Sequence, residues 1–286
     1  MAQKKPMSKK MQIRMLVDAG LLLALATFMS LIKIFEMPFG GSITLFSMLP
    51  IAIFAYRYGV VKTIPVSVVY GIIQMLLGIK NFSYVSGLGA YAVVFFFDYI
   101  IAFGVLALSG VFRKTKPDFA IASAGILSAL EVLIFFITIR MAISRAKNAA
   151  DITADFPLYR NLFIIACAVI IIFCAVGFIF KTKVHPSGII IVSGIAVAGI
   201  LRTICHFISG VTVWSGYAPE GVAAPLYSLY YNLSYMVPEI IVTAIGALIA
   251  CTLLDFDAEI MNVRMKDPSK VKKLADIDLE DDETDK

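Results

Sequence analysis

The sequence predicts an all-α, polytopic membrane helix bundle, and three observations lead to this fold class. Of the 286 residues, 60% are hydrophobic and 16% are charged, whereas soluble domains average about 45–50% apolar and about 25% charged residues. Apolar runs of roughly 18 or more residues recur along the chain, and each can cross a bilayer as a helix. The runs are apolar throughout, which argues against the alternating strands of a β-barrel. A soluble globular enzyme and a disordered chain are thereby excluded.

In chain order we expect about eight spans, at residues 15–35, 43–57, 60–78, 87–112, 119–140, 160–180, 187–213 and 225–254. The first is too long for the apolar part of a typical signal peptide and lacks a clear cleavage site, so we expect it to be retained. The second and third are short and joined by a tight turn at residues 57–59, and short spans of this kind often line a cavity. Together the spans predict one membrane domain over residues 15–254.

The two ends of the chain are predicted to lie in the cytoplasm. Residues 1–14 form a basic arm, and residues 255–286 form a charged tail that is mostly acidic from Leu274 onward. With the N-terminus inside, most Lys and Arg residues of the loops fall on the cytoplasmic side, as the positive-inside rule requires. The loop over residues 140–160 is the exception. Because topology accounts for the basic arm, the lipid bilayer is the expected partner of the chain and nucleic acid is not.

The chain carries no motif of the common catalytic or metal sites. It has no Gly-x-x-x-x-Gly-Lys-Ser/Thr loop for ATP, no His-Glu-x-x-His and no Gly-x-Ser-x-Gly. The cysteines all lie inside apolar runs and form no Cys-x-x-Cys pair, which indicates neither a zinc site nor a disulfide framework; they are Cys167, Cys174, Cys205 and Cys251. We therefore expect no enzyme activity, no catalytic residue, no metal and no cofactor.

Two polar residues in the apolar runs are candidates for a binding site. Asp98 lies in the middle of the fourth span, where a carboxylate costs about 2.5–3.5 kcal/mol on insertion scales. It is either satisfied by a neighbouring residue or partner protein, or it serves a ligand or an ion. His206 shares a helical face with Arg202 one turn earlier and Gly210 one turn later. His206 is either a satisfied core residue or a ligand contact beside the space that Gly210 leaves.

Aromatic and amide side chains lie at the same depth, in the outer half of the membrane. Trp214 is the only tryptophan, and it is either an interfacial residue or a stacking platform. The last span opens with a polar-aromatic stripe that contains Tyr227, Tyr231, Ser234 and Tyr235, with Asn232 among them and a second acid, Glu239, deeper. Such a set predicts a pocket that opens outward and suits a small, flat, cationic or amphoteric heterocycle.

These residues resemble a known family, the thiamine-specific substrate-binding subunits (S components, ThiT type) of energy-coupling factor transporters. The best match is HFISGVTVWSGYAPEG followed by LYSLYYN, which supplies the family residues His206, Gly210, Trp214, Tyr227, Ser228 and Asn232. An acid-tyrosine pair of the family is matched by Asp98 and Tyr99. Gly20 and Ala24 fall where these subunits carry an Ala-x-x-x-Ala motif. The resemblance covers residues 10–113 and 181–254.

The resemblance implies a six-helix core, to which residues 116–180 add an inserted helix pair. It implies high-affinity binding of extracellular thiamine at the plasma membrane of a prokaryote. A transmembrane coupling subunit and two ATP-binding subunits would complete the uptake complex, and Gly20 and Ala24 would face the coupling subunit. Asp98 would meet the pyrimidine, with His206 and Asn232 as polar partners. The ligand rings would meet Trp214, Tyr99 and Tyr227, with Gly210, Ser228 and Arg202 nearby and a loop tyrosine, Tyr84 or Tyr91.

The chain also departs from the family, and other functions stay open. Asp98 replaces the usual Glu, and first-loop aromatic contacts of some members fall on Gly40 or Gly41. One alternative is a self-sufficient secondary transporter of a small heterocyclic cation, coupled to protons through Asp98, Glu239 and His206; the lack of an inverted repeat counts against it. Another is an S component for a related vitamin or precursor. A membrane enzyme has no nucleophile motif to support it.

Overall fold

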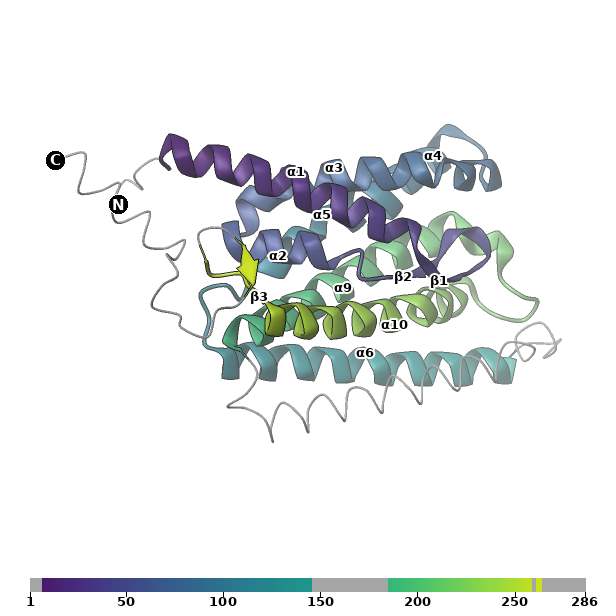
Figure 1. Ribbon diagram of the computed structural model, residues 1–286. Helices are drawn as coiled ribbons and strands as arrows, with labels where there is room; N and C mark the ends of the chain where they lie inside the picture. The colour runs from purple at the N-terminus through teal and green to yellow at the C-terminus, as the bar shows by residue number, and fades with distance from the viewer. Residues whose placement is uncertain (1–6, 146–184, 259–260, 264–286) are drawn as a thin grey trace, which may run out of the picture.

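The computed structural model describes residues 7–145, 185–258 and 261–263. It is an elongated bundle whose long helices run side by side (Figure 1). Within the described residues, six helical segments are long and apolar enough to cross a membrane. They are α1 (Lys9–Leu31), α3 (Val60–Leu77), the continuous segment Leu88–Gly110, α6 (Pro117–Arg145), α9 (Pro186–Thr212) and α10 (Ala224–Leu253). Six of the predicted spans are confirmed; the one at 160–180 lies outside the described residues.

The predicted span at residues 43–57 is wrong. Strand β1 (Lys33–Glu36) pairs antiparallel with β2 (Ser42–Thr44), and the segment then continues into α2 (Leu49–Tyr58), a helix of 10 residues. Ten residues rise about 15 Å, half of the roughly 30 Å apolar core of a bilayer. Pro50 lies in the first turn of α2, and Gly59 ends it at φ +84°. Because α2 is almost entirely buried, its apolar residues contact protein rather than lipid.

The span Leu88–Gly110 changes its helical pitch at Asp98, the acid singled out in the sequence. It consists of α4 (Leu88–Val93), a π-helical segment η3 (Val94–Ile100), α5 (Ile101–Gly104) and a 3₁₀ segment η4 (Val105–Gly110). Asp98 and Tyr99 both lie in the π-helical segment. The wider turn allows these consecutive side chains to line the same cavity, and π-helical turns inside α-helices frequently occur at functional sites.

Helix α9 is the most buried of the six spans and occupies the centre of the bundle. It packs against α10, α6 and η4. Its Gly194 meets η4 at very close range, because a Cβ built there would lie 1.8 Å from the carbonyl oxygen of Ser109. Only a residue without a side chain allows the two backbones to approach this closely.

Helix α6 supplies the described part of the predicted inserted pair. It lies along α9 and α10, on the opposite side of the bundle from α1 (Figure 1). Ala120, Ala124 and Ser128 recur every four residues along it, and small residues at this spacing let membrane helices pack closely. Its other side exposes large apolar side chains such as Ile126 and Leu130. Helix α6 therefore covers one face of the bundle.

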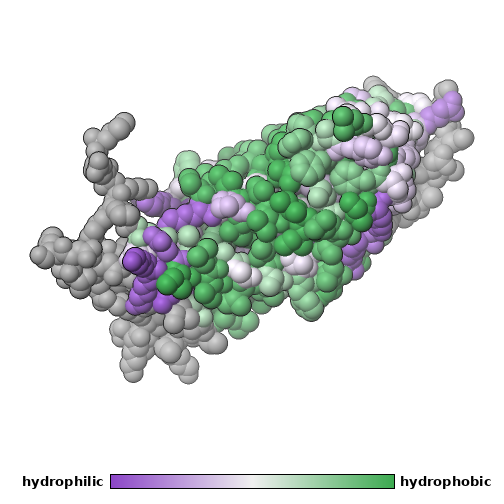
Figure 2. Space-filling model, turned by 90° about the horizontal axis from the view of Figure 1, so that it is seen from above, coloured by the Kyte–Doolittle hydropathy of each residue, from purple (hydrophilic) through white to green (hydrophobic). Residues whose placement is uncertain are grey.

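The chain after α10 returns to the bundle at the end opposite the β1–β2 hairpin (Figure 1). Strand β3 (Leu254–Asp255) pairs with β4 (Asn262–Val263). The buried Arg57 guanidinium donates to Asp18 on α1 and to the carbonyl oxygens of Phe256 and Ala258. The first residues of the predicted tail are thus fixed to α1 and α2. A broad apolar surface separates hydrophilic ends in Figure 2, as expected for a membrane protein.

Candidate functional site

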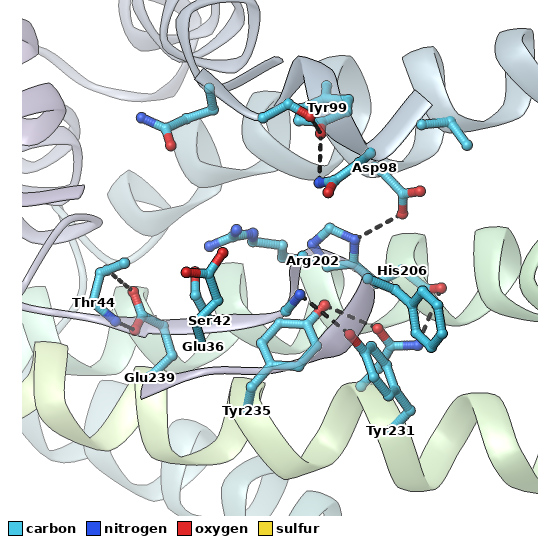
Figure 3. A pocket seen from close by; sticks show the side chains of 18 of the residues that line it. Glu36, Ser42, Thr44, Asp98, Tyr99, Arg202, His206, Tyr231, Tyr235 and Glu239 are labelled. Carbon is cyan, nitrogen blue, oxygen red and sulfur yellow. Dashed lines mark hydrogen bonds and ion pairs between the residues drawn. The ribbon is translucent and has the colours of Figure 1, made fainter. Parts of the chain in front are cut away.

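A cavity of about 250 Å³ lies at the end of the bundle that carries the β1–β2 hairpin (Figure 3). Its walls come from this hairpin, η3, α9, α10 and the short segments η2 (Ile79–Tyr84) and η5 (Trp214–Tyr217). All but one of the predicted site residues line it: Asp98, Tyr99, Arg202, His206, Gly210, Trp214, Tyr227, Ser228 and Asn232. The exception is Tyr84. Residues from four separate segments of the chain are brought together here.

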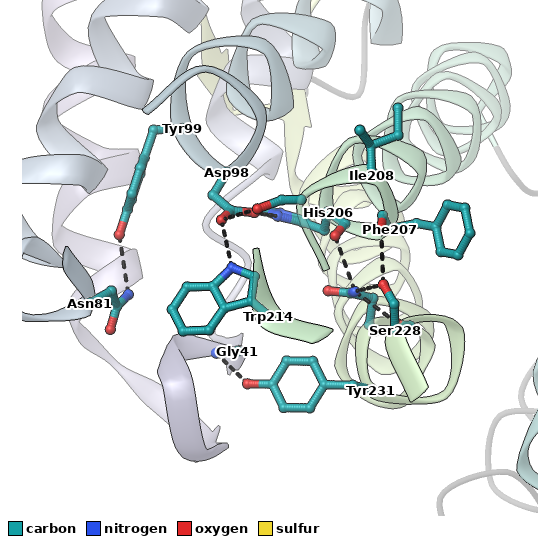
Figure 4. A network of polar contacts seen from close by, with 12 residues as sticks. Gly41, Asn81, Asp98, Tyr99, His206, Phe207, Ile208, Trp214, Ser228 and Tyr231 are labelled. Carbon is teal, nitrogen blue, oxygen red and sulfur yellow. Dashed lines mark hydrogen bonds and ion pairs between the residues drawn. The ribbon is translucent and has the colours of Figure 1, made fainter. Parts of the chain in front are cut away.

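Asp98 is the centre of a polar network at this cavity (Figure 4). Its carboxylate lies 3.0 Å from Nδ1 of His206 and accepts hydrogen bonds from the Ser209 hydroxyl at 2.6 Å and the Trp214 indole at 3.2 Å. With Asp98 as the acceptor in this contact too, Nδ1 of His206 would carry the proton. Asp98 is therefore satisfied by neighbouring residues and also fixes two of the predicted ligand contacts.

One ring nitrogen of His206, a residue that lines the cavity, is left without a hydrogen-bond partner within the described residues. This nitrogen is Nε2, and it is buried. With the proton on Nδ1, Nε2 is an acceptor that can take a hydrogen from a bound molecule. A buried polar atom without a partner costs free energy, which a ligand donor at this position would recover.

The cavity wall that carries Tyr99 is held in place by Gly78 and the η2 segment that follows it. The Tyr99 hydroxyl accepts from Asn81 at 3.1 Å and donates to the carbonyl of Gly78 at 3.2 Å. Its ring is stacked on Phe82, with centroids 5.9 Å apart and planes at 12°. The ring therefore has a fixed orientation at the edge of the cavity.

Asn232 joins α10 to α9 behind the cavity. Its amide nitrogen donates to the carbonyl of His206 at 3.2 Å and of Ser228 at 2.9 Å, and its oxygen accepts from Tyr235 at 2.9 Å. The Ser228 hydroxyl donates to the carbonyl of Phe207 at 2.9 Å. These hydrogen bonds fix the position of α9, which carries His206, relative to α10.

The role expected for Gly210 needs a correction. We expected it to leave space beside His206, but a Cβ built at Gly210 would lie 2.0 Å from the Ser228 hydroxyl oxygen. The space is therefore filled by α10. Gly210 is required because the two helices cross closely at this position, although it also lines the cavity.

The aromatic part of the site includes a residue from the first loop. The Phe39 ring lies 4.3 Å from the centroid of Tyr217, 6.0 Å from Trp214 and 5.4 Å from Tyr84. Phe39 has φ +66°, in the left-handed region that favours glycine. The first loop thus contributes an aromatic side chain, although Gly40 and Gly41 occupy the positions expected for it. Tyr84 meets this cluster, whereas Tyr91 contacts Phe82.

Comparison with known proteins identifies the family. The model of the family described as "Thiamine transporter protein (Thia_YuaJ)" matches residues 16–256. The chain belongs to this family. A relative, the thiamine transporter ThiT of Bacillus subtilis (strain 168), is 22% identical over 241 residues, which cover 84% of this chain and 91% of the relative. This is a family of transporters and not of enzymes.

A solved structure of ThiT from Listeria monocytogenes has the same fold. It aligns with a TM-score of 0.51 at 18% identity, covering 84% of this chain and 94% of that one. At this identity the likeness concerns the fold alone. The helical architecture of this thiamine transporter family member is therefore established independently of its site residues.

Two charged residues of the cavity have roles that the sequence did not predict, and one of them, Glu239, was not among the predicted contacts. Glu239, noted only as a second buried acid, accepts from the backbone amide and the hydroxyl of Thr44, both at 2.6 Å, and from Ser47 at 3.3 Å. Its carboxylate therefore fastens the first loop to α10. Arg202 places its guanidinium 4.2 Å from the centre of the Phe103 ring. Its Nε has no hydrogen-bond partner within the residues that the structure describes.

An ion-paired cluster lies at the rim of the cavity. Glu36 on β1 pairs with Lys33 at 2.8 Å and with Lys80 at 3.2 Å. The hydrogen bonds from Lys33 and Lys80 hold the pKa of the Glu36 carboxyl below its usual value. No motif marks these residues in the sequence, because the β1–β2 hairpin brings together positions that have no helical periodicity. Within the described residues, no group of three His, Cys, Asp or Glu side chains could hold a metal ion.

Replacing Gly210 with Ala is expected to lower the melting temperature of the protein. The added methyl group would meet Ser228, and overpacking of this kind costs about 1–3 kcal/mol. The double change Gly210→Ala with Ser228→Gly is expected to melt above Gly210→Ala, because it removes the atoms in conflict. Thermal unfolding in detergent measures both. Equal melting temperatures of Gly210→Ala and the wild type would show that the helices do not cross as described.

Proposed function

We propose that this chain binds extracellular thiamine in the cavity around Asp98 and acts as the S component of an ATP-driven energy-coupling factor complex. The observation that carries the proposal is the cluster of Asp98, His206 and Trp214 in one cavity of a thiamine transporter family member. Thiamine combines a cationic thiazolium ring with an aminopyrimidine. Asp98 would meet the aminopyrimidine, with His206 as a polar partner, and aromatic faces attract the cation.

The same residues give each predicted contact a physical role. Trp214, Tyr99 and Tyr227 supply flat apolar surface against the rings, while Asn232 and Ser228 hold the backbone that presents His206. Gly210 and Arg202 border the cavity. Glu36, Lys33 and Lys80 lie at its mouth, where the first loop would close over the bound molecule.

Energy for uptake would come from partner subunits, because the sequence has no ATP-binding P-loop. Gly20 and Ala24 are both exposed on α1, and a Cβ built at Gly20 would meet no atom within 4 Å. Small residues spaced by four present a surface that another membrane helix can approach closely. We propose this face as the contact with the transmembrane coupling subunit, which in turn carries two ATP-binding subunits.

The orientation we propose places both termini in the cytoplasm of a prokaryotic cell. The start of α1 and the β3 strand after α10 lie at one end of the bundle, and the cavity lies near the other (Figure 1). Positive residues of the turn between η4 and α6, such as Arg113 and Lys114, lie toward the former end (Figure 1), as the positive-inside rule requires of a cytoplasmic end. The cavity would then open to the outside.

Replacing Gly20 with Trp is expected to abolish assembly with the coupling subunit and leave thiamine binding unchanged. The large ring would keep the partner helix away from α1, while the α1 residues that line the cavity, Ser30 and Leu31, lie at the far end of the helix. The measurement is co-purification of the tagged variant with the coupling and ATP-binding subunits. Leu130→Trp on the exposed face of α6 is the matched control and should assemble normally. Normal assembly of Gly20→Trp would refute this docking surface.

The alternative function is a proton-coupled secondary transporter, which the membrane-embedded carboxylates of Asp98 and Glu239 favour. Uptake into vesicles distinguishes it from the proposed function. The purified chain in vesicles should take up no thiamine in a pH gradient, and uptake should require the partner subunits and ATP. Uptake driven by a pH gradient without partners would establish the alternative. The oxygens of Glu239 already accept hydrogen bonds from Thr44 and Ser47, which argues against a proton-carrying role for that residue.

A further inference from the structure

Helix α6 carries a buried acid that belongs to no part of the cavity described above. Glu131 lies within the span Pro117–Thr138 and is 8% exposed. It points toward α9 and lines a second, apolar cavity of about 100 Å³ between α6, α9 and α10. A charge at this depth is costly unless it is paired. The contacts of Glu131 therefore decide in which protonation state it is held.

The Thr203 hydroxyl connects Glu131 on α6 to α9. The Thr203 hydroxyl oxygen lies 3.0 Å from a carboxyl oxygen of Glu131 and 3.0 Å from the carbonyl oxygen of Gly199. A hydroxyl has a single hydrogen to donate, and a carbonyl can only accept. The Thr203 hydroxyl donates toward both oxygens, as the Thr212 hydroxyl does toward Ile208 and Ser209, so its single hydrogen is shared. A protonated Glu131 would supply a second hydrogen to this contact.

No charged group within the described residues compensates Glu131 in its surroundings. It is the only titratable residue among those that line the second cavity. On α9, Arg202 is stacked on Phe103 and His206 bonds to Asp98, and on α10, Glu239 bonds to Thr44. In the part of the chain that the structure describes, no ion pair connects Glu131 to any of these groups. The neutral acid is consistent with such an environment, and a carboxylate is not.

The position of Thr203 connects this contact to the candidate thiamine site. Thr203 follows Arg202 and precedes His206 by three residues, and both of these line the first cavity. We infer that Glu131 is a proton-carrying positioning residue, through which the inserted helix α6 holds α9 and so fixes His206 for ligand binding. Loss of the proton at alkaline pH would leave an uncompensated charge in an apolar environment and loosen α6 from α9. The part of this inference that concerns thiamine rests on the proposed function.

Infrared spectroscopy tests the protonation state directly and without ligand. The difference spectrum of wild type minus Glu131→Gln near neutral pH should contain the carbonyl stretch of a protonated carboxyl group. That band should vanish at alkaline pH and be replaced by carboxylate bands. Its absence at neutral pH would overturn the assignment of the proton.

Thiamine titrations test the positioning role. Gln retains an N–H group that can donate to Thr203, so Glu131→Gln should bind within about twofold of wild type, as should Thr203→Ser. Glu131→Leu and Thr203→Val remove the bond and should each weaken binding by about 2- to 10-fold, the range for one neutral hydrogen bond. Wild-type affinity should fall over the pH range in which the infrared band is lost, while that of Glu131→Gln stays flat.

The outcomes separate this inference from the proposed function. A purely structural role for α6 would give Glu131→Gln and wild type the same pH profile, and equal affinities of Glu131→Gln and Glu131→Leu would refute the hydrogen bond. If wild type binds no thiamine at all, the proposed function fails. The infrared measurement would still decide whether Glu131 carries a proton.

Discussion

Replacing Asp98 with Asn is expected to weaken thiamine binding by roughly 10- to 150-fold. The carboxylate accepts hydrogen bonds from His206, Ser209 and Trp214. An Asn amide has one acceptor oxygen, and its NH₂ group would face donors. Hydrogen bonds to a charged group contribute about 1.5–3 kcal/mol each, which corresponds to this range of affinity. Calorimetric titration of thiamine into the purified variant measures the loss.

Two further variants distinguish loss of a ligand contact from a general disturbance of the fold. Asp118→Asn changes a carboxylate at the start of α6, at the end of the bundle opposite the β1–β2 hairpin (Figure 1), and should bind like wild type. His206→Ala should weaken binding as well, because it removes a ring that lines the cavity and contacts Asp98. If Asp98→Asn and His206→Ala both bind thiamine normally, the assignment of the site is wrong.

Replacing Gly194 with Ala is expected to cost more stability than the same change at any other described glycine. The new Cβ would lie 1.8 Å from the carbonyl oxygen and 2.7 Å from the carbonyl carbon of Ser109. Both are backbone atoms, so a side-chain rotation cannot relieve the conflict and α9 must move away from η4. We expect a cost at or above the upper end of the roughly 1–3 kcal/mol seen for overpacked cores. Thermal unfolding in detergent measures the drop in melting temperature.

Gly89→Ala is the matched control for this change. Gly89 is also helical, but a Cβ there would meet no atom within 4 Å. Because Ala is the better helix former by about 1 kcal/mol, this variant should be as stable as wild type or slightly more stable. If Gly194→Ala has the same melting temperature as Gly89→Ala, α9 and η4 are farther apart than described.

The membrane bundle could be predicted because apolar length alone identifies most spans. The same criterion failed for residues 43–57. The apolar side chains of α2 are buried against other helices, and an apolar run does not distinguish burial in protein from contact with lipid. Only the structure reveals that Gly59 and the β1–β2 hairpin shorten this helix to half the thickness of the membrane.

The helical part of the site could be predicted because its residues repeat with the helical period. Arg202, His206 and Gly210 share one face of α9, and the structure places all three on the same cavity. The contribution of Phe39 could not be predicted, since it depends on a positive φ in a loop. Glu131 could have been found, because the argument that singled out Asp98, an acid in the middle of an apolar run, applies to it equally.

The most direct test of the proposed function is a thiamine titration followed by tryptophan fluorescence. Trp214 is the only tryptophan in the chain, and its indole donates to Asp98 at the cavity, so any change in emission reports on this site. After removal of bound ligand, we predict saturable quenching at submicromolar thiamine and no response to unrelated vitamins. No quenching, together with no heat in a calorimetric titration of the folded protein, would contradict thiamine as the ligand.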